Sequence, residues 1–401
     1  MKKRLAVLGS TGSIGRTCLE VAARQPERFE VVALAAGSRW QVLREQILRF
    51  RPKVVSVASE ESAQALRRTL RDAIPPILVG PEGLETVATW AEADIVVSAL
   101  TGGVGVKPTV AAIRAGRDVA LANKEVIVVA GEIVSREAKE HGSRLLPIDS
   151  EISAIWQCLE AGGSKAVRRV LLTASGGAFR GLSAEELRDV TPERALSHPT
   201  WVMGRKVTVD SASLMNKGFE ILEVHWLFDV PLEKIEVLVH HQSIIHSLVE
   251  YVDGSLMAQL GVPDMTLPIQ YGLTYPERLP SDVKPLDLAQ IGSLTFERPD
   301  TTRFPALALA RQAAQIGGTM PAVLSGADEV AVQAFLDGRL PFTGIPTLVE
   351  ETMSRHTVAQ SPTLEQSLDA EQWAHVAAAA LIDEVASADC SGRLVGVRGS
   401  S

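Results

Sequence analysis

Residues 4–15 read Arg-Leu-Ala-Val-Leu-Gly-Ser-Thr-Gly-Ser-Ile-Gly, an aliphatic run followed by a turn with three evenly spaced glycines. The run predicts a buried strand, a helical pattern follows it, and residues 29–34 predict a second strand. In a unit of this kind, the glycine turn and the helix N-terminus bind a pyrophosphate. The stretch therefore predicts a dinucleotide-binding, Rossmann-like domain with a doubly wound parallel sheet, and an α/β fold for the chain.

The second strand is followed by Gly37, Ser38 and Arg39. A carboxylate at this place would bind the ribose 2′-hydroxyl of NAD, but the chain has none there. Ser38 and Arg39 instead suit a 2′-phosphate, so we expect NADPH as the cofactor. The alternative is that Arg39 merely begins a solvated helix over residues 39–50.

Strands and helices keep alternating as far as residue 149, which predicts the boundary of the NADPH-binding domain (1–149). One strand, over 118–122, ends directly before Asn123, Lys124 and Glu125. Ligands bind at the carboxyl ends of strands in such sheets, so Asn123 is expected to reach the nicotinamide side of the cofactor. Lys124 is either a second contact there or a structural residue.

Two short polar motifs follow further strands. Asp149, Ser150 and Glu151 end the strand predicted over 144–148, and two acids two residues apart suit a hard cation such as Mg²⁺ or Mn²⁺. The same residues would equally serve as the N-cap of the next helix. Ser175 lies beside two glycines after a strand over 171–173, which predicts either a phosphate cradle or an ordinary turn.

Residues 198–223 hold the densest group of polar side chains. His198, Trp201, Met203 and Gly204 predict a lid loop with an aromatic side chain and a glycine hinge. A helix from about Ala212 would place Ser213, Asn216, Lys217 and Glu220 on one face, which suits an anionic, oxygen-rich ligand and a hard metal ion. The alternative is a solvated polar helix.

The rest of the chain predicts a support for this site. Strands over 235–239, 245–252 and 255–260 belong to a middle α+β domain (150–285) with catalytic and dimerisation roles, and the open face of their antiparallel sheet is the expected homodimer surface. Residues 286–305 predict a linker. Helical patterns at 306–316, 327–337, 347–355 and 370–387 predict a C-terminal helical bundle (306–401).

Composition narrows the classes of function. The 401 residues carry a formal net charge of -8, with no basic domain, so we expect no nucleic-acid partner. The first residues lack the pattern of a signal peptide, and no run is apolar enough to span a membrane, so we expect a cytoplasmic protein without membrane contact. The three cysteines, Cys18, Cys158 and Cys390, are too few and too dispersed for a disulfide framework.

These motifs, in this order, resemble the 1-deoxy-D-xylulose 5-phosphate reductoisomerase family over most of the chain. The resemblance implies an enzyme that uses NADPH and Mn²⁺ or Mg²⁺, with Co²⁺ as a further candidate, and that acts as a homodimer. It would convert 1-deoxy-D-xylulose 5-phosphate to 2-C-methyl-D-erythritol 4-phosphate in non-mevalonate isoprenoid synthesis. The stretches that carry the resemblance are 9–15, 122–125, 146–151, 173–177, 198–204, 209–220, 242–249, 259–265 and 283–287.

The resemblance also assigns roles by motif position. The implied metal ligands are Asp149, Glu151 and Glu220, and the implied catalytic residues are Glu151, Lys217 and His198. The implied substrate contacts are Ser150, Glu151, Ser175, His198, Trp201, Met203, Ser211, Asn216, Lys217 and Glu220. The implied cofactor contacts are Thr11, Gly12, Ser13, Ile14, Gly37, Ser38, Arg39, Asn123, Lys124, Glu125 and Gly204.

The proton-transferring group is a substrate hydroxyl, Glu151 or a water. Ile152 stands where the family usually has histidine, and Ser213 where it has threonine. The rival functions are another NADP-dependent oxidoreductase, such as a semialdehyde dehydrogenase with Cys158 as its nucleophile, and a non-enzymatic NADPH-sensing scaffold.

Overall fold

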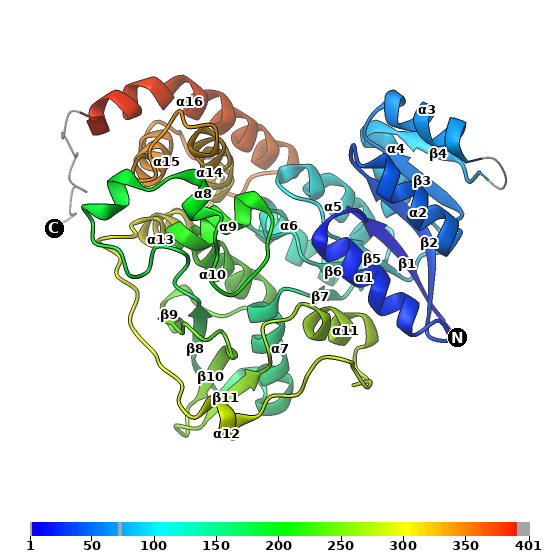
Figure 1. Cartoon of the computed structure of the whole chain (residues 1–401), viewed down its shortest axis with the longest axis horizontal. Helices are drawn as coiled ribbons and strands as arrows, with labels where there is room; N and C mark the ends of the chain where they lie inside the picture. The colour runs from blue at the N-terminus through cyan, green and yellow to red at the C-terminus, as the bar shows by residue number, and fades with distance from the viewer. Residues whose placement is uncertain (1, 71–73, 391–401) are drawn as a thin grey trace. The chain divides into compact units, whose positions relative to one another are not determined.

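The computed structural model describes residues 2–70 and 74–390, and its N-terminal part is a seven-stranded sheet with the order β4-β3-β2-β1-β5-β6-β7 (Figure 1). All six pairings in this sheet are parallel, which confirms the predicted doubly wound domain. The strands are β1 (Lys3–Leu8), β2 (Phe29–Ala36), β3 (Val54–Val57), β4 (Ile77–Val79), β5 (Ile95–Ser98), β6 (Asp118–Leu121) and β7 (Leu145–Pro147).

Helices connect successive strands of this sheet, as its parallel topology requires. Their bounds are α1 (Ser13–Arg24), α2 (Trp40–Phe50), α3 (Glu60–Thr69), α4 (Gly80–Ala88), α5 (Val106–Arg114) and α6 (Lys124–His141). The strand order reverses on either side of β1, so the turn after β1 lies at the switch point where such sheets bind ligands. The glycine turn occupies this position.

The glycines of the turn are required by its backbone. Gly9 has a φ of +79°, and a Cβ there would lie 2.3 Å from the Ala99 oxygen. A Cβ at Gly15 would lie 2.3 Å from the Gly9 oxygen, because α1 packs closely on the turn. Beneath the turn, Leu5 and Val7 are fully buried in the aliphatic core of the sheet. The sequence GxxGxxG therefore fixes both the turn and its contact with α1.

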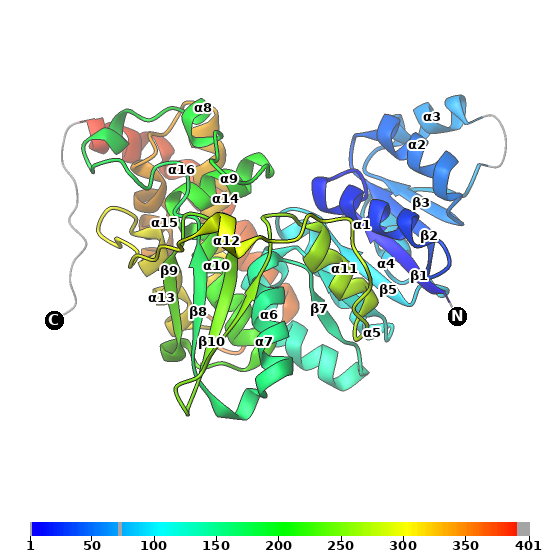
Figure 2. The same ribbon diagram turned by 60° about the horizontal axis from the view of Figure 1, so that its bottom comes forward.

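A second sheet has the order β11-β10-β8-β9, formed by β8 (Val167–Ala174), β9 (Ile235–Val239), β10 (Ile245–Tyr251) and β11 (Leu256–Leu260). β10 and β11 form the predicted antiparallel hairpin. Helix α7 (Ser150–Gly162) packs against β10 and β11 (Figure 2). Helix α11 (Thr266–Thr274), which the sequence patterns did not predict, packs against α1, α7 and β7.

The C-terminal helices confirm the predicted bundle. They are α13 (Ala306–Ile316), α14 (Met320–Leu336), α15 (Gly344–Ser354) and α16 (Leu364–Cys390). α14 packs against α13, α15 and α16 and buries Val323, Ala327 and Phe335. Residues 391–401 of the predicted helical domain lie outside the described part of the chain. The predicted linker contains one short helix, α12 (Leu288–Ile291), and one strand-like bridge from Glu297 to Val239.

The chain divides into two compact units, and each unit consists of several separate stretches of the sequence. The first holds residues 1–171, 223–236 and 244–293, and the second holds 172–222, 237–243 and 294–401. Three of the five boundaries between the units fall inside β8, β9 and α10 (Met215–Phe228), so each of these elements contributes to both units. The four-part domain scheme stays a prediction. No helix within the described residues is long and apolar enough to cross a membrane.

One prediction of local structure is wrong. The sequence predicted a single helix from about Ala212, but α9 (Arg205–Ser213) ends there and α10 begins at Met215. Leu214 separates them with a φ of 66°, and the Ser213 hydroxyl accepts a hydrogen bond from the Met215 amide. Asn216, Lys217 and Glu220 therefore share α10, whereas Ser213 caps the break.

Candidate active site

The glycine turn before α1 and the segment after β2 leave groups accessible that a dinucleotide cofactor could contact. Gly12 is the N-cap residue of α1 and makes no side-chain cap, so the first amides of α1 remain available to an anion. Ser13, next to it, is exposed and Ile14 is half-buried, whereas Thr11 is buried. At the end of β2, Gly37, Ser38 and Arg39 are all exposed. The turn and the β2 end therefore provide candidate contacts for a pyrophosphate and a 2′-phosphate.

The segment after β6 is buried. The Asn123 side chain, in a residue only 1% exposed, donates a hydrogen bond to the Gly102 oxygen at 3.1 Å. A Cβ at Gly105 would lie 2.2 Å from the Asn123 amide nitrogen, so this glycine makes room for it. Glu125 is also buried, in the first turn of α6. Asn123 is thus held rigidly at the carboxyl edge of the sheet.

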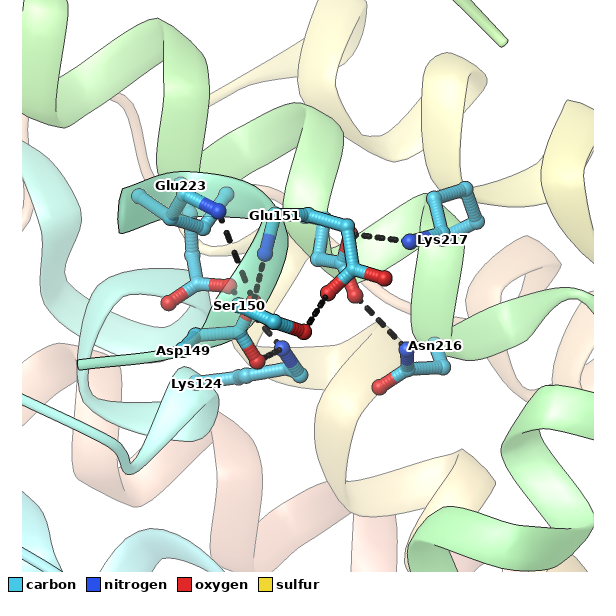
Figure 3. Close-up of polar contacts among 9 residues, drawn as sticks. Lys124, Asp149, Ser150, Glu151, Asn216, Lys217 and Glu223 are labelled. Atoms are coloured by element: carbon cyan, nitrogen blue, oxygen red, sulfur yellow. Dashed lines mark hydrogen bonds and ion pairs between the residues drawn. The ribbon is translucent and has the colours of Figure 1, made fainter. Parts of the chain in front are cut away.

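The first group of acids lies at the N-terminus of α7 (Figure 3). The Oδ1 of Asp149 accepts hydrogen bonds from the amides of Glu151 and Ile152, which confirms the alternative that Asp149 is an N-cap. Its Oδ2 remains directed at the Lys124 ammonium, 2.5 Å away. The Ser150 hydroxyl donates to Glu151 Oε2 at 2.5 Å. A cap and a metal ligand are therefore compatible roles for Asp149.

The second group lies on the first turns of α10. The Asn216 amide donates to Glu220 Oε1 at 2.7 Å, and the Lys217 ammonium forms an ion pair with Glu220 Oε2. Glu220 is fully buried and Lys217 is 4% exposed. This helix face confirms the predicted arrangement of amide, ammonium and carboxylate, apart from Ser213.

One carboxylate oxygen from each of Asp149, Glu151 and Glu220 lies within 4.8 Å of the other two. Glu223, which the sequence analysis did not assign, follows Glu220 by one turn of α10 and lies 3.5 Å from the Lys124 ammonium. The formal charges of this group are four negative and two positive, carried by Asp149, Glu151, Glu220, Glu223, Lys124 and Lys217. A divalent cation would neutralise the excess of two negative charges. The donor set fits a hard cation. The Glu-x-x-Glu spacing was the available signal for Glu223.

Ser175 and His198 form the third group, which joins the predicted phosphate cradle to the predicted lid. His198 Nε2 lies 2.9 Å from Ser175 Oγ, and its Nδ1 accepts hydrogen bonds from the amides of Thr200 and Trp201. An imidazole nitrogen that accepts carries no proton, so Nε2 is the protonated nitrogen and donates to Ser175. Burial, followed by the nearby Arg180 charge, lowers the pKa of His198 and favours this neutral form.

The serine cradle is tightly packed. Gly177 has a φ of +69°, and a Cβ there would lie 2.4 Å from the backbone oxygen of Ser211, on α9. Within the lid loop, Trp201 and Met203 are half-buried, Val202 is completely exposed and Gly204 is exposed. Ile152 is fully buried in α7, so the departure from the family's usual histidine falls on a core-facing side chain.

A doubly wound sheet with a glycine turn at its switch point, together with this polar site, defines an oxidoreductase of the dinucleotide-dependent class. Three family models match the chain: 1-deoxy-D-xylulose 5-phosphate reductoisomerase over residues 5–131, and two C-terminal domain models of that enzyme over residues 145–228 and 260–377. The chain belongs to the 1-deoxy-D-xylulose 5-phosphate reductoisomerase family.

Individual relatives are similar over nearly their whole length. The reductoisomerase of Symbiobacterium thermophilum is 56% identical over 382 residues, which cover 94% of this chain and 98% of the relative. That of Pelotomaculum thermopropionicum is 52% identical and covers 93% and 96%. The solved Zymomonas mobilis enzyme, in complex with NADPH, superposes with a TM-score of 0.89 at 42% identity, covering 96% of this chain and all of that chain.

A further solved reductoisomerase is a complex with NADPH, fosmidomycin and magnesium. It superposes with a TM-score of 0.89 at 40% identity and covers 95% of this chain and 98% of that chain. The likeness extends over both sheets and the helical bundle, and so confirms the predicted fold class.

Proposed function

We propose that this chain converts 1-deoxy-D-xylulose 5-phosphate to 2-C-methyl-D-erythritol 4-phosphate with NADPH and a divalent cation, in non-mevalonate isoprenoid synthesis. The observation that carries the proposal is the convergence of the three acids, Asp149, Glu151 and Glu220. Solved structures of related enzymes with the same fold contain NADPH, and one of them also contains magnesium. The reaction is an isomerisation to a branched aldehyde, which a hydride from NADPH and a proton then reduce to the alcohol.

Asp149, Glu151 and Glu220 would hold the cation, with Mg²⁺ or Mn²⁺ favoured by the all-carboxylate donors and Co²⁺ as a further candidate. The bound cation would supply Lewis-acid stabilisation of negative charge on the substrate's oxygens. Lys124 restrains Asp149, and Asn216 and Lys217 restrain Glu220. These donors orient the acids before a substrate arrives, so less ordering is left for the binding step.

Ser175, Ser211, Asn216 and Lys217 would bind the substrate phosphate and its neighbouring hydroxyls. The Ser175 hydroxyl accepts hydrogen bonds from His198 and from the Gly177 amide, which leaves its own proton free to be donated to a phosphate oxygen. The Lys217 ammonium, which is paired with Glu220, would supply the positive charge for the substrate's anionic oxygens. Ser150, hydrogen-bonded to Glu151, is placed to contact a substrate hydroxyl.

The lid loop of His198, Trp201, Met203 and Gly204 would close over the substrate and exclude water from reactive intermediates. His198 serves in this scheme as a fixed donor to Ser175, since its Nδ1 is already used by the loop. Glu151, whose carboxylate accepts a hydrogen bond from the Ser150 hydroxyl, remains the candidate base among the chain's own residues.

The cofactor would lie along the glycine turn, with Thr11, Gly12, Ser13 and Ile14 at its pyrophosphate. Gly37, Ser38 and Arg39 would bind the 2′-phosphate, while Asn123, Glu125 and Gly204 would lie toward the nicotinamide. Homodimerisation through the open face of the second sheet also belongs to the proposal. It is supported by the exposed apolar side chains of Leu256 and Met257 on β11. Cytoplasmic location stays a prediction.

The rival functions are less consistent with the site. A semialdehyde dehydrogenase needs a reactive thiolate, but burial raises the pKa of the Cys158 thiol to about 11, so it stays protonated. A cofactor-sensing scaffold does not account for three converging acids and their lysine partners.

NADPH oxidation with 1-deoxy-D-xylulose 5-phosphate separates these functions. We expect turnover with Mg²⁺ or Mn²⁺, none after chelation, and recovery when the metal is restored. Absence of turnover with metal, substrate and NADPH all present would reject the proposed reaction. Glu220→Gln should abolish turnover and preserve NADPH binding, whereas loss of both would indicate a structural role.

A further inference from the structure

Lys206, in the first turn of α9, places its ammonium between two buried carboxylates. Its Nζ lies 2.7 Å from Asp210 Oδ2, on the same helix, and 2.7 Å from Asp328 Oδ2, on α14. It also lies 4.5 Å from the centre of the Phe219 ring, on α10. Asp328 is 0% exposed and Asp210 1% exposed. One ammonium group therefore joins three helices of the second unit.

The ion pairs of Lys206 with Asp210 and Asp328 are expected to add little to the stability of the fold. A cation in the first turn of a helix opposes the helix dipole, and a lysine four residues before an aspartate is the weaker order for such a pair. Within the described residues, Asp328 Oδ1 accepts no hydrogen bond, so only the Oδ2 side of this buried carboxylate faces a donor. Buried ions held this way stabilise a fold no better than apolar side chains of the same size. The network is better explained by a requirement to hold α9 in a fixed position.

The element that the network holds carries parts of the substrate site at both ends. Gly204, the hinge of the lid loop, is the N-cap residue of α9. Ser211 directly follows Asp210, and its backbone oxygen leaves no room for a side chain at Gly177, beside the Ser175 cradle. A small shift of α9 would therefore move both the lid hinge at Gly204 and Ser211, which packs beside the Ser175 cradle. Substrate-binding contacts tolerate little displacement of this kind.

We propose that Lys206, Asp210 and Asp328 are positioning residues that fix α9 on α14, so that the C-terminal helical bundle sets the affinity for the substrate phosphate. The inference rests on the proposed function for its kinetic readout. It gives the bundle a role beyond support, because Asp328 lies on the bundle's central helix. Lys206 is placed to act through α9, so its effect would reach the substrate indirectly.

Three variants of α14 test the proposal. Asp328→Leu removes the contact with Lys206 but keeps the branched shape of the side chain, and Asp328→Asn removes the charge but keeps an oxygen in place. Glu329→Leu is the matched control, because the neighbouring Glu329 pairs with His375 of α16, at 3.2 Å. KM for 1-deoxy-D-xylulose 5-phosphate and kcat would be measured with NADPH and Mg²⁺, together with Tm and hydrogen exchange of the α9 amides.

For Asp328→Leu we expect KM to rise roughly tenfold with a smaller change in kcat and faster exchange of α9. The Tm should stay close to that of the wild type, because Lys206 keeps Asp210 as its partner. Asp328→Asn should raise KM about two- to threefold, and Glu329→Leu should leave KM and α9 exchange unchanged. An unchanged KM in both Asp328 variants, or an equal rise in Glu329→Leu, would overturn the proposal.

Two further results are also decisive. If Asp328→Leu does not fold, Asp328→Asn carries the test, and wild-type KM and α9 exchange in that variant overturn the proposal. If the wild type shows no turnover, the proposed function fails, and α9 exchange still decides this inference. Faster exchange in Asp328→Leu than in Glu329→Leu supports it, and equal exchange overturns it.

Discussion

His198 Nε2 lies 2.9 Å from Ser175 Oγ, while Nδ1 of the same ring accepts the amides of Thr200 and Trp201. One imidazole thus folds the start of the lid loop and orients a serine of the phosphate cradle. The two functions require opposite nitrogens and a single tautomer, with the proton on Nε2. This relationship connects lid order to substrate affinity and makes both sensitive to the protonation of one ring.

His198→Asn separates the two functions of the ring. Asparagine can accept backbone amides two residues ahead in a local turn, but its side chain is too short to reach Ser175. We expect KM for the substrate to rise about tenfold and kcat to change less. His356→Asn is the control, since His356 contacts Thr319 in the second unit at 2.8 Å, away from the lid. Equal KM in wild type and His198→Asn would contradict the role of the Ser175 contact.

The lid should also weaken at acid pH. Burial, then Arg180, lowers the pKa of His198 below its ordinary 6.5, so an open lid takes up a proton more readily than a folded one. The folded lid therefore loses stability as the pH falls below 6.5 toward the lowered value. We expect substrate KM to rise over this range by more in the wild type than in His198→Asn. The variant corrects for titration of the substrate phosphate. Parallel pH profiles would argue against the assignment.

Lys124 is expected to act on the acids rather than on the cofactor. Its ammonium lies 2.5 Å from Asp149 and 3.5 Å from Glu223, so Lys124→Met removes the positive charge from two largely buried carboxylates. The variant should lose about 3–5 kcal/mol of stability and bind Mg²⁺ about 10–100-fold more weakly. NADPH affinity, measured by nucleotide fluorescence, should stay within about twofold. Weaker NADPH binding with unchanged Mg²⁺ binding would make Lys124 a cofactor contact.

The helical bundle contains a pH-dependent ion pair. His375 lies 3.2 Å from Glu329; this hydrogen bond raises the pKa of His375 and lowers that of Glu329. The histidine's contribution to stability is complete below 6.5 and is lost as the pH rises through its raised pKa. The carboxylate's contribution is present above 4.5 and is lost as the pH falls through its lowered pKa.

The stability difference between wild type and His375→Gln should consequently be greatest between pH 4.5 and 6.5 and should decline toward about pH 8. Both side chains are partly exposed, so the difference should not exceed about 1 kcal/mol. Urea unfolding at several pH values measures it. A difference that grows from pH 6.5 to about pH 8 would contradict the expected direction of the pH dependence.

Much of the fold could be predicted from short stretches of sequence, because the hydrophobic spacing and the glycines of a stretch determine its own strand, helix or turn. Periodic aliphatic residues predicted β1 to β7, and the glycines at 9, 12 and 15 located the switch point. Local patterns failed where distant packing decides. The break at Leu214 gives a non-glycine residue a positive φ, which no propensity favours. Helix α11 has little amphipathic contrast, because most of its residues are buried.

The candidate site shows the same limit. The motifs identified Asp149, Glu151 and Glu220, and the structure brings a carboxylate oxygen of each together. The sequence left Lys124 open because its partners, Asp149 and Glu223, lie 25 and 99 positions away. Lys206 and Asp328 were not recognised for the same reason: a contact between α9 and α14 has no signature in either helix alone.

Calorimetric titration of the metal-free protein with Mn²⁺ determines whether Asp149, Glu151 and Glu220 share one divalent cation. We predict one site per chain in the wild type, and its loss in each of Asp149→Asn, Glu151→Gln and Glu220→Gln while NADPH binding is retained. Mn²⁺ binding that is unchanged in any one of the three variants would contradict the shared site.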